Sequence, residues 1–350
     1  MERKNVAGNS AKHSAAGHGF SSLPEGCIAD VLALTSPRDV CRMSAVASVF
    51  LSAAESDALW ERFLPADYRE IIARSSGSSS WRRHFSSKKE LYFTLCDYPL
   101  LIDEGKKSFW LEKRSGKKCY MLASRELTII WGDTPGYWEW TSLPESRFPE
   151  VAYLQAVCWF EIRGKINTCM LSPRTNYAAY LVFHAGRSHG FEDVPVESSI
   201  EIVGNETTTR VIYLARYRSE EQAEHDDLEY ECVSIEDVRS WINDNLTQLY
   251  SSQEPGKALL GLEDVKTWMN SNVMKLFSSQ ENQEPTSSIR SDLPYPKKRE
   301  DSWFEIELGE FFIEGGEDTE LEITLMEVKA GHWKDGLIVE GIEIRPKGDL

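Results

Sequence analysis

The sequence lacks the features that would place it in a membrane or in an oxidising compartment. Its 350 residues include no apolar run approaching the ~20 residues that a membrane-spanning helix needs. Residues 1–19 are predicted to be a disordered polar tail and contain no apolar core of a secretory signal. The seven cysteines are scattered without a CxxC pair, which is typical of reduced thiols rather than of disulfides or zinc sites. We therefore expect a cytoplasmic or nuclear protein without a metal or cofactor.

Positive charge is also scarce. The chain has 39 Lys and Arg against 56 Asp and Glu, which gives a net charge of −17. Binding to nucleic acid or to an anionic membrane surface depends on basic side chains that neutralise phosphates, so neither partner is expected. One short basic cluster, "PYPKKRE" at residues 294–300, fits either a nuclear localisation signal or a solvated loop.

Catalytic motifs are absent as well. There is no HExxH, GxSxG, P-loop or GxGxxG, and the histidines lie far apart in the sequence, at His84, His184, His189 and His332. The glutamates of residues 304–323 alternate with apolar residues, which predicts the solvated face of strands. Nothing in this pattern singles out two carboxylates for glycoside hydrolysis, and we expect a non-catalytic protein.

Helical spacing dominates residues 23–64. Apolar side chains recur there at intervals of three and four, which predicts short helices. Thr35-Ser36-Pro37 ends the first helix and starts the second, because Ser is a favoured N-cap and Pro a favoured first helical residue. Ser56-Asp57 begins a third helix, which Pro65 ends. Three short helices bury too small a core to be stable alone, so we expect them to pack an apolar face against a partner.

An ordered set of positions in this region resembles the plant F-box motif, the alternative being any three-helix bundle. The set comprises Leu23-Pro24, Ile28, Leu32, Ser36-Pro37-Arg38-Asp39, Arg42, Val46, Phe50, Leu59-Trp60 and Leu64-Pro65. The resemblance implies an F-box over residues 20–68 that docks on a SKP-family adaptor of a cullin-RING ubiquitin ligase and performs no chemistry itself. The residues expected to bind the adaptor are Leu23, Pro24, Ile28, Leu32, Pro37 and Val46.

Beyond a linker over residues 69–87, with its Gly/Ser-rich "RSSGSSS", the pattern changes. A helical segment starts at residue 88, and from residue 106 apolar and polar residues alternate in at least eight short segments rich in β-branched and aromatic side chains. This spacing predicts a mainly antiparallel β-sandwich of jelly-roll type.

The strand segments resemble those of phloem lectins, also called Nictaba-like lectins. The likeness is carried by "ELTIIWGDTPGYWEW", "RFPEVAYLQAVCWFEIRGKI", "LSPRTNYAAYLVF", "WFEIELGEFF" and "GLIVEGIEIRP", and it spans residues 88–346. It implies a carbohydrate-binding sandwich for N-acetylglucosamine oligomers or N-glycan cores. Together with the F-box, it identifies the chain as similar to plant F-box proteins with a phloem-lectin domain.

Residues 217–292 interrupt this resemblance. Residues 219–238 contain nine acidic residues and no Lys or Arg, and residues 235–254 and 262–281 agree at eleven of twenty positions. In both copies the apolar residues recur at the spacing of an amphipathic helix. The two predicted helices either bury their apolar faces against each other in a hairpin or dock on a partner.

The stretch "TIIWGDTPGYWEW" at residues 128–140 gathers aromatic rings around one turn. A sugar stacks its apolar face on an exposed ring while neighbouring polar groups such as Asp133 and Glu139 bind its hydroxyls. By the resemblance, Trp131 and Trp138 match the two sugar-binding tryptophans of the lectin family. We predict that Trp131 and Trp138 face the sugar and that Trp140 is structural. Tyr137 is a further candidate for the sugar site, and the default for the tryptophans at other strand ends is core: Trp159, Trp303 and Trp333.

The main hypothesis is therefore a substrate-receptor subunit of a SKP–cullin–F-box ubiquitin ligase, whose lectin-like domain binds glycans or glycoproteins. One alternative is a cytosolic or nuclear lectin without a ligase role. Another is a module that recognises protein surfaces through the duplicated helices.

Overall fold

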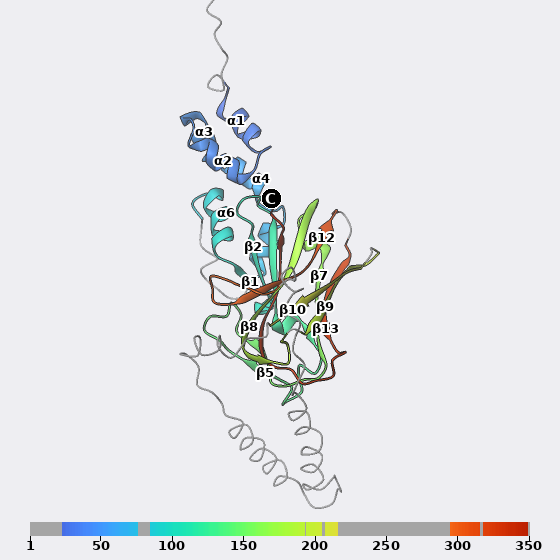
Figure 1. Cartoon of the computed structure of the whole chain (residues 1–350). Coiled ribbons are helices and arrows are strands. Elements are labelled where there is room, and N and C mark those ends of the chain that lie inside the picture. The colour runs from blue at the N-terminus through green and yellow to red at the C-terminus, as the bar shows by residue number, and fades with distance from the viewer. Residues whose placement is uncertain are drawn as a thin grey trace, which may run out of the picture. The chain divides into compact units, whose positions relative to one another are not determined.

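The computed structural model describes residues 23–75, 85–192, 194–204, 207–215, 295–315 and 318–348. The predicted tail and the insertion with its duplicated helices lie outside the described residues. In this part of the chain, helices come first and the strands of two β-sheets follow (Figure 1).

Short helices occupy the N-terminal part of the described chain. Their bounds are α1 (Glu25–Leu32), α2 (Pro37–Ser44), α3 (Ser48–Ala54), α4 (Asp57–Phe63), α5 (Tyr68–Ala73) and α6 (Lys88–Asp97). Ser36 caps α2 as predicted, since its side chain accepts a hydrogen bond from the Asp39 N–H at 3.1 Å. Four helices lie between residues 25 and 63, where the sequence predicts three. The extra break falls at Ala47, whose backbone is extended (φ −152°, ψ 149°). Helix α5 also covers residues 69–73 of the expected linker.

The helices enclose apolar side chains that recur at helical spacing. Ile28, Leu32, Val40 and Leu59 are at most 1% exposed, and the fully buried Trp60 donates its indole N–H to the Ala54 carbonyl at 2.7 Å. A buried indole N–H needs such an acceptor, because an unpaired donor in an apolar core is costly. This hydrogen bond fixes the end of α3 against α4.

The strands follow the period-two pattern only in part: several alternate buried and exposed side chains, whereas residues 118–123 and 339–344 are buried throughout. Their bounds are β1 (Leu100–Ile102), β2 (Lys107–Leu111), β3 (Lys118–Ala123), β4 (Thr128–Ile129), β5 (Trp138–Thr141), β6 (Val151–Leu154), β7 (Phe160–Asn167), β8 (Thr175–His189), β9 (Pro195–Ile202), β10 (Thr208–Tyr213), β11 (Lys297–Lys298), β12 (Phe304–Ile313), β13 (Glu320–Glu327) and β14 (Asp335–Pro346).

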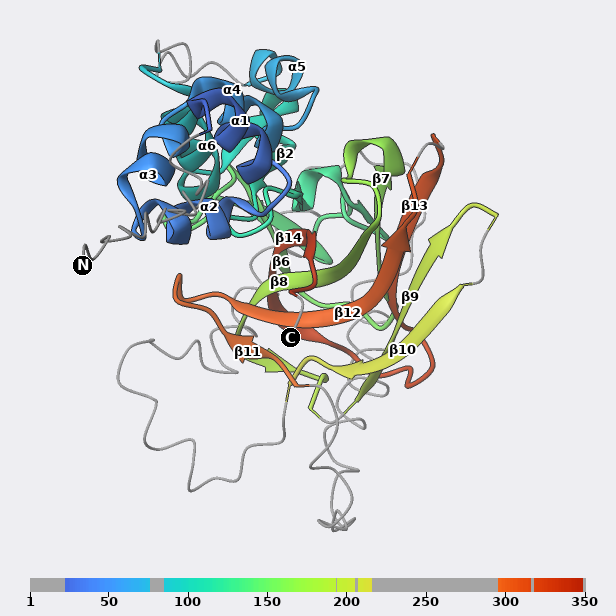
Figure 2. The ribbon, with the colours of Figure 1, turned by 90° about the horizontal axis from the view of Figure 1, so that it is seen from above.

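The strands form two antiparallel sheets whose inner faces meet in one core (Figures 1 and 2). The larger sheet has nine strands in the order β1-β2-β3-β14-β8-β12-β11, with β6 pairing with both β5 and β14. The smaller sheet has the order β10-β9-β13-β7-β4. Large side chains from both sheets fill the space between them, among them Phe160, Phe183, Leu325 and Val339, all fully buried. The sequence prediction of a mainly antiparallel β region with two sheets is confirmed.

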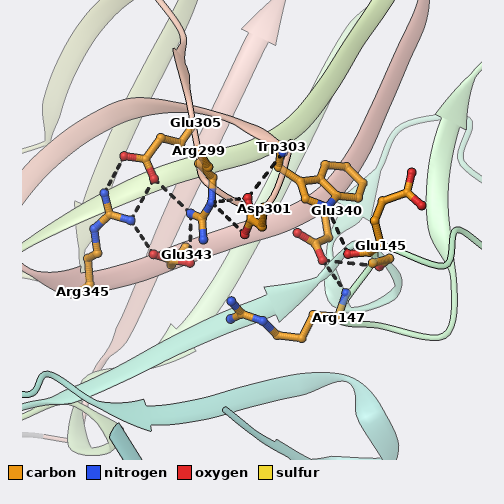
Figure 3. Close-up of polar contacts among 10 residues, drawn as sticks. Glu145, Arg147, Arg299, Asp301, Trp303, Glu305, Glu340, Glu343 and Arg345 are labelled. Atoms are coloured by element: carbon orange, nitrogen blue, oxygen red, sulfur yellow. Dashed lines mark hydrogen bonds and ion pairs between the residues drawn. The ribbon is translucent and has the colours of Figure 1, made fainter. Parts of the chain in front are cut away.

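The outer face of the larger sheet carries an ion-pair network (Figure 3). Arg299 contacts the carboxylates of Glu305 at 2.9 Å and Glu343 at 3.2 Å, and Arg345 reaches Glu305 at 2.7 Å. Glu343 is only 2% exposed. Arg299, the last basic residue of the cluster at residues 294–300, is thus part of this network, and Lys297–Lys298 form strand β11 rather than a loop.

Two arginines keep the Glu305 carboxylate ionised. Burial opposes ionisation of Glu305, but hydrogen bonds and charges from Arg345 and Arg299 outweigh burial and hold its pKa below the usual 4.5. A carboxyl whose folded-state pKa is depressed adds stability above its unfolded pKa, and that stability is lost as the pH falls through the folded value.

We therefore predict that Glu305→Gln lowers the free energy of unfolding by about 2–4 kcal/mol at neutral pH, because it removes a carboxylate that two partly buried arginines share. Arg299 and Arg345 are then left with Glu343 as their common partner. The loss should shrink as the pH falls below 4.5 and should vanish below the lowered folded-state pKa of Glu305, where the wild-type carboxylate is protonated as well. Urea unfolding followed by circular dichroism measures both effects. The control is Glu320→Gln, whose exposed pair with Lys165 should contribute less than about 1 kcal/mol. Equal losses in the two variants would contradict a structural role for the network.

Candidate functional site

The turn after β4 is closed by its own backbone. The Gly132 N–H donates to the Ile129 carbonyl at 2.9 Å, and the Thr134 N–H donates to the Trp131 carbonyl at 2.9 Å. A side chain on Gly132 would place Cβ only 2.9 Å from the Ile129 oxygen, and Gly136 adopts φ +86°. The glycines seen in the sequence are thus required for a tight turn of fixed shape.

Trp131 occupies an unfavourable backbone conformation in this turn. Its φ is 63° and its side chain is 55% exposed. A bulky residue in the left-handed region costs about 1–2 kcal/mol, and an exposed ring recovers little of that by burial. An exposed tryptophan held at such a cost points to a role in binding.

Strand β5 turns both of its tryptophans, Trp138 and Trp140, to one face. Trp138 pairs with Leu154 of β6, is 4% exposed and lies against Phe160 in the core, with ring centroids 6.4 Å apart. The predicted place of Trp138 on an exposed rim is therefore wrong. The reason is register: Trp138 and Trp140 alternate with Glu139 and share the inward face.

Trp140 supports the turn from the inner side. It is half-buried, and its indole N–H donates to the Gly132 carbonyl at 3.0 Å. The Arg125 guanidinium stacks on its other side, 3.7 Å from the ring centroid. These contacts hold the turn in the shape that displays Trp131.

Three exposed or half-exposed rings form what we call the aromatic row: Trp131, Tyr137 and Trp333. The centroids of Trp131 and Tyr137 lie 6.2 Å apart, and those of Tyr137 and Trp333 lie 6.5 Å apart. Trp333 is 41% exposed and comes from a loop far along the chain. Sequence reasoning assigned Trp333 to the core and missed it. Its position between Gly331 and Gly336, both with positive φ, was a signal for a tryptophan presented by a turn.

The other two tryptophans assigned to the core by default differ from each other. Trp303 is 1% exposed, which confirms the prediction. Trp159 is 47% exposed, and its indole N–H donates to Glu161 at 2.8 Å, so its assignment to the core is wrong.

A buried lysine fixes the loop that presents Trp333. The backbone of Lys334 exchanges two hydrogen bonds with Val157, at 2.8 and 2.9 Å. Its fully buried ammonium forms an ion pair with Glu327 and donates to the Cys158 carbonyl at 3.2 Å. The loop is therefore attached to both sheets and brings Trp333 to Tyr137.

Polar groups stand beside the aromatic row. Asp133 is exposed at the turn, and Glu139 accepts a hydrogen bond from the Gln155 amide. Exposed rings with carboxylate and amide groups nearby can stack on the apolar face of a sugar and bind its hydroxyls. Within the described ranges, no group of three or more His, Cys, Asp or Glu residues could hold a metal ion.

A second candidate surface lies on the helices. The large apolar side chains exposed there are Leu23, Val31, Leu34, Val46 and Leu51. Leu34 and Val46 are the most exposed, at 87% and 77%, and nothing in the helical fold explains their position. Exposed apolar side chains mark an interaction surface where they form a contiguous patch, which makes these residues candidates for one. None of the described helices is long and apolar enough to cross a membrane.

The predicted adaptor-binding residues divide into two groups. Leu23, Pro24 and Val46 are exposed and available to a partner. Ile28 and Leu32 are fully buried and Pro37 is buried as well, so their expected place on a docking face is corrected: they form the core that supports it. Helical periodicity could not separate the two groups, because Leu23, Pro24 and Val46 lie just outside the helices, where the spacing does not apply.

Comparison with known proteins shows which family and which relatives the chain is similar to. A family model described as Phloem protein 2 matches residues 117–346. The chain is 40% identical to F-box protein PP2-B1 of Arabidopsis thaliana over 94% of its own length and 90% of that protein. It is 41% identical to F-box protein PP2-B10 of the same plant, over 93% and 94% of the two chains. F-box protein PP2-B15 is 38% identical, over 93% and 96%.

The contrast between Trp138 and Trp131 yields a stability prediction. Trp138→Ala should lower the free energy of unfolding by about 3–5 kcal/mol, as expected for a large aromatic side chain removed from a core. Trp131→Gly should be neutral or stabilising by up to about 1 kcal/mol, because glycine tolerates positive φ. Urea unfolding followed by far-UV circular dichroism compares the two. A large loss for Trp131→Gly with none for Trp138→Ala would reverse our assignment of core and rim.

Proposed function

This chain belongs to the phloem protein 2 family, and we propose that it is the substrate-receptor subunit of a SKP–cullin–F-box ubiquitin ligase. On this proposal residues 20–68 are an F-box, and the two sheets are a lectin-like sandwich of jelly-roll type that binds N-acetylglucosamine-containing glycans or glycoproteins. The observation that carries the proposal is the match to relatives named F-box proteins over more than nine-tenths of the chain. The chain itself would be a non-catalytic receptor in the cytoplasm or nucleus.

The helices would dock through their exposed apolar side chains. Leu34 and Val46 are exposed on the helical surface, while Ile28 and Leu32 are buried in the core that holds the helices together. Burying an exposed Leu or Val against an adaptor contributes about 1.5–3 kcal/mol for a complete side chain. Two or three such residues supply a hydrophobic anchor in a helix-in-groove interface.

The aromatic row would bind the sugar. Trp131 and Trp333 offer exposed ring faces at the two ends of the row, and Tyr137 adds a ring and a hydroxyl between them. The carboxylates of Asp133 and Glu139 would accept hydrogen bonds from sugar hydroxyls. Because the turn and the Trp333 loop are both braced by buried contacts, the rings would need little reorganisation on binding.

A lectin or protein-interaction module without a ligase role is the alternative function. This alternative uses the β region in the same way but does not require the helices to bind an adaptor. An adaptor-binding experiment therefore distinguishes the two functions.

We predict that the full chain co-purifies with a SKP-family adaptor and that Leu34→Glu/Val46→Glu abolishes this. Charges introduced at exposed positions should leave the helices folded while preventing burial in an apolar groove. The matched control is Val203→Glu, at an exposed valine that follows β9. Size-exclusion chromatography of the mixed proteins measures the complex.

Failure of the wild-type chain to bind any SKP-family adaptor would remove the ligase role and leave the alternative. Unchanged binding by the double variant would instead show that the docking surface lies elsewhere.

We predict that Trp131→Ala and Trp333→Ala each weaken binding of N,N′,N″-triacetylchitotriose by roughly tenfold or more, as for an aromatic hot spot. Phe312→Ala, at an exposed ring of β12, is the control and should bind like the wild type. Isothermal titration calorimetry measures the affinities. Binding that both tryptophan variants retain would show that the aromatic row is not the sugar site.

A further inference from the structure

Positive charge gathers at one place on this acidic chain. Residues 36–42, 112–117 and 172–174 carry six Lys and Arg against two Asp and Glu, although the net charge of the whole chain is −17. Four of the six cations form no ion pair with any residue that the structure describes. We call these four residues the basic rim: Arg38, Arg114, Lys117 and Arg174.

Hydrogen bonds bring the members of the basic rim together from three parts of the chain. The Arg38 N–H at the start of α2 donates to the Arg114 carbonyl at 3.5 Å, which joins the helix to the turn between β2 and β3. The Lys117 ammonium in the same turn donates to the Pro173 carbonyl at 3.3 Å, next to Arg174. The pKa of Lys117 is lowered by burial and then by the positive charge of Arg174. The four cations thus follow one another along one surface.

The turn between β2 and β3 is packed against the helices. The Gly116 N–H donates to the Glu112 carbonyl at 2.8 Å, and a Cβ on Gly116 would lie only 3.0 Å from the carbonyl oxygen of Phe63. The Glu112 carboxylate accepts hydrogen bonds from the backbone N–H groups of Arg114 at 3.1 Å and Ser115 at 2.8 Å. The acidic residue of this turn therefore binds the turn itself and leaves the neighbouring cations unpaired.

Unpaired like charges on one surface favour a partner of opposite charge. They repel one another in the free chain, and this repulsion is relieved when an anionic group binds between them. Three of the four residues are arginines, whose planar guanidinium groups can bind a carboxylate through two parallel hydrogen bonds. The basic rim is therefore suited to an acidic segment of another protein.

The basic rim lies far from the aromatic row. Strand β14 begins at Asp335, two residues after Trp333, and its Ile344 pairs with Tyr120 near the start of β3. Nine residues of extended chain span about 30 Å, so the row and the turn between β2 and β3 lie at opposite ends of the sheet. One ligand of the size of a short oligosaccharide cannot contact both.

The basic rim instead adjoins the exposed apolar residues of the helices. Arg38 is exposed on α2, with Leu34 four residues before it and Val46 just after the end of the helix. An apolar centre with a polar, charged rim is the usual composition of a protein interface. The charged rim of such an interface mainly sets the rate of association and its dependence on salt.

We propose that the docking surface for the SKP-family adaptor extends beyond the F-box helices onto the turn between β2 and β3, where the basic rim binds an acidic segment of the adaptor. This inference rests on the proposed ligase function and adds to it a contribution from the lectin-like domain. Arg114 and Arg174 lie outside residues 20–68, and they steer the adaptor toward the apolar residues of the helices.

Biolayer interferometry of the full chain with a purified SKP-family adaptor tests the proposal. Arg114→Glu/Arg174→Glu should lower the association rate constant about tenfold or more at low salt. This difference should fall below about twofold near 1 M salt, where the Debye length is about 3 Å. The matched control is Lys106→Glu/Lys298→Glu, which changes the net charge equally at exposed lysines that also lack an ion pair in the described part of the chain. The control should associate like the wild type.

The outcomes separate the inference from the function on which it rests. Equal association rates for the two double variants at low salt would overturn the role of the basic rim and keep the ligase function. A wild-type chain that binds no adaptor would overturn the ligase function itself.

A milder variant keeps the test independent of how well the charge-reversed chain folds. Arg114→Gln/Arg174→Gln removes both charges without reversing them and should still lower the rate about threefold at low salt. A slower rate that persists at 1 M salt would show a loss of shape instead of charge and would also contradict the proposal. Thermal melts of each variant show that it is folded.

Discussion

The burial of Trp138 against Phe160 determines how the candidate sugar site is built. Side chains of a strand alternate between faces, so one buried residue fixes the orientation of all its neighbours. With Trp138 inside, Trp140 turns toward the base of the loop and Glu139 turns outward. A slip of one residue would bury Glu139 and expose the core tryptophan, which explains why the turn before β5 is so tightly hydrogen-bonded.

A second constraint joins parts of the chain that are far apart in sequence. Lys334 is fully buried, and its ion pair with Glu327 offsets the cost of removing a charge from water. Its backbone bonds to Val157 attach the loop of Trp333 next to β7. The rings of the aromatic row thus rest on one apolar contact, Trp138 against Phe160, and one ionic contact, Lys334 with Glu327.

Much of the architecture could be predicted from the sequence, because periodicity and turn residues act locally. The Ser36 cap, the antiparallel strands and the glycine-bounded turn at Trp131 follow from such signals. The assignment of Trp138 failed because the alternation permits either face to be the core, and only pairing with Leu154 decides between them. Trp333 was missed because its proximity to Tyr137 depends on a long-range contact that no local pattern encodes.

The central claim is that exposed rings, and not the buried tryptophan, meet the ligand. It is tested most directly by following the tryptophan indole N–H signals of the full chain by NMR during titration with triacetylchitotriose, with assignments from single Trp→Phe variants. The account predicts saturable shifts for Trp131 and Trp333, while the signals of Trp138 and Trp60 stay in place. Shifts of the Trp138 signal with Trp131 and Trp333 unmoved would contradict it.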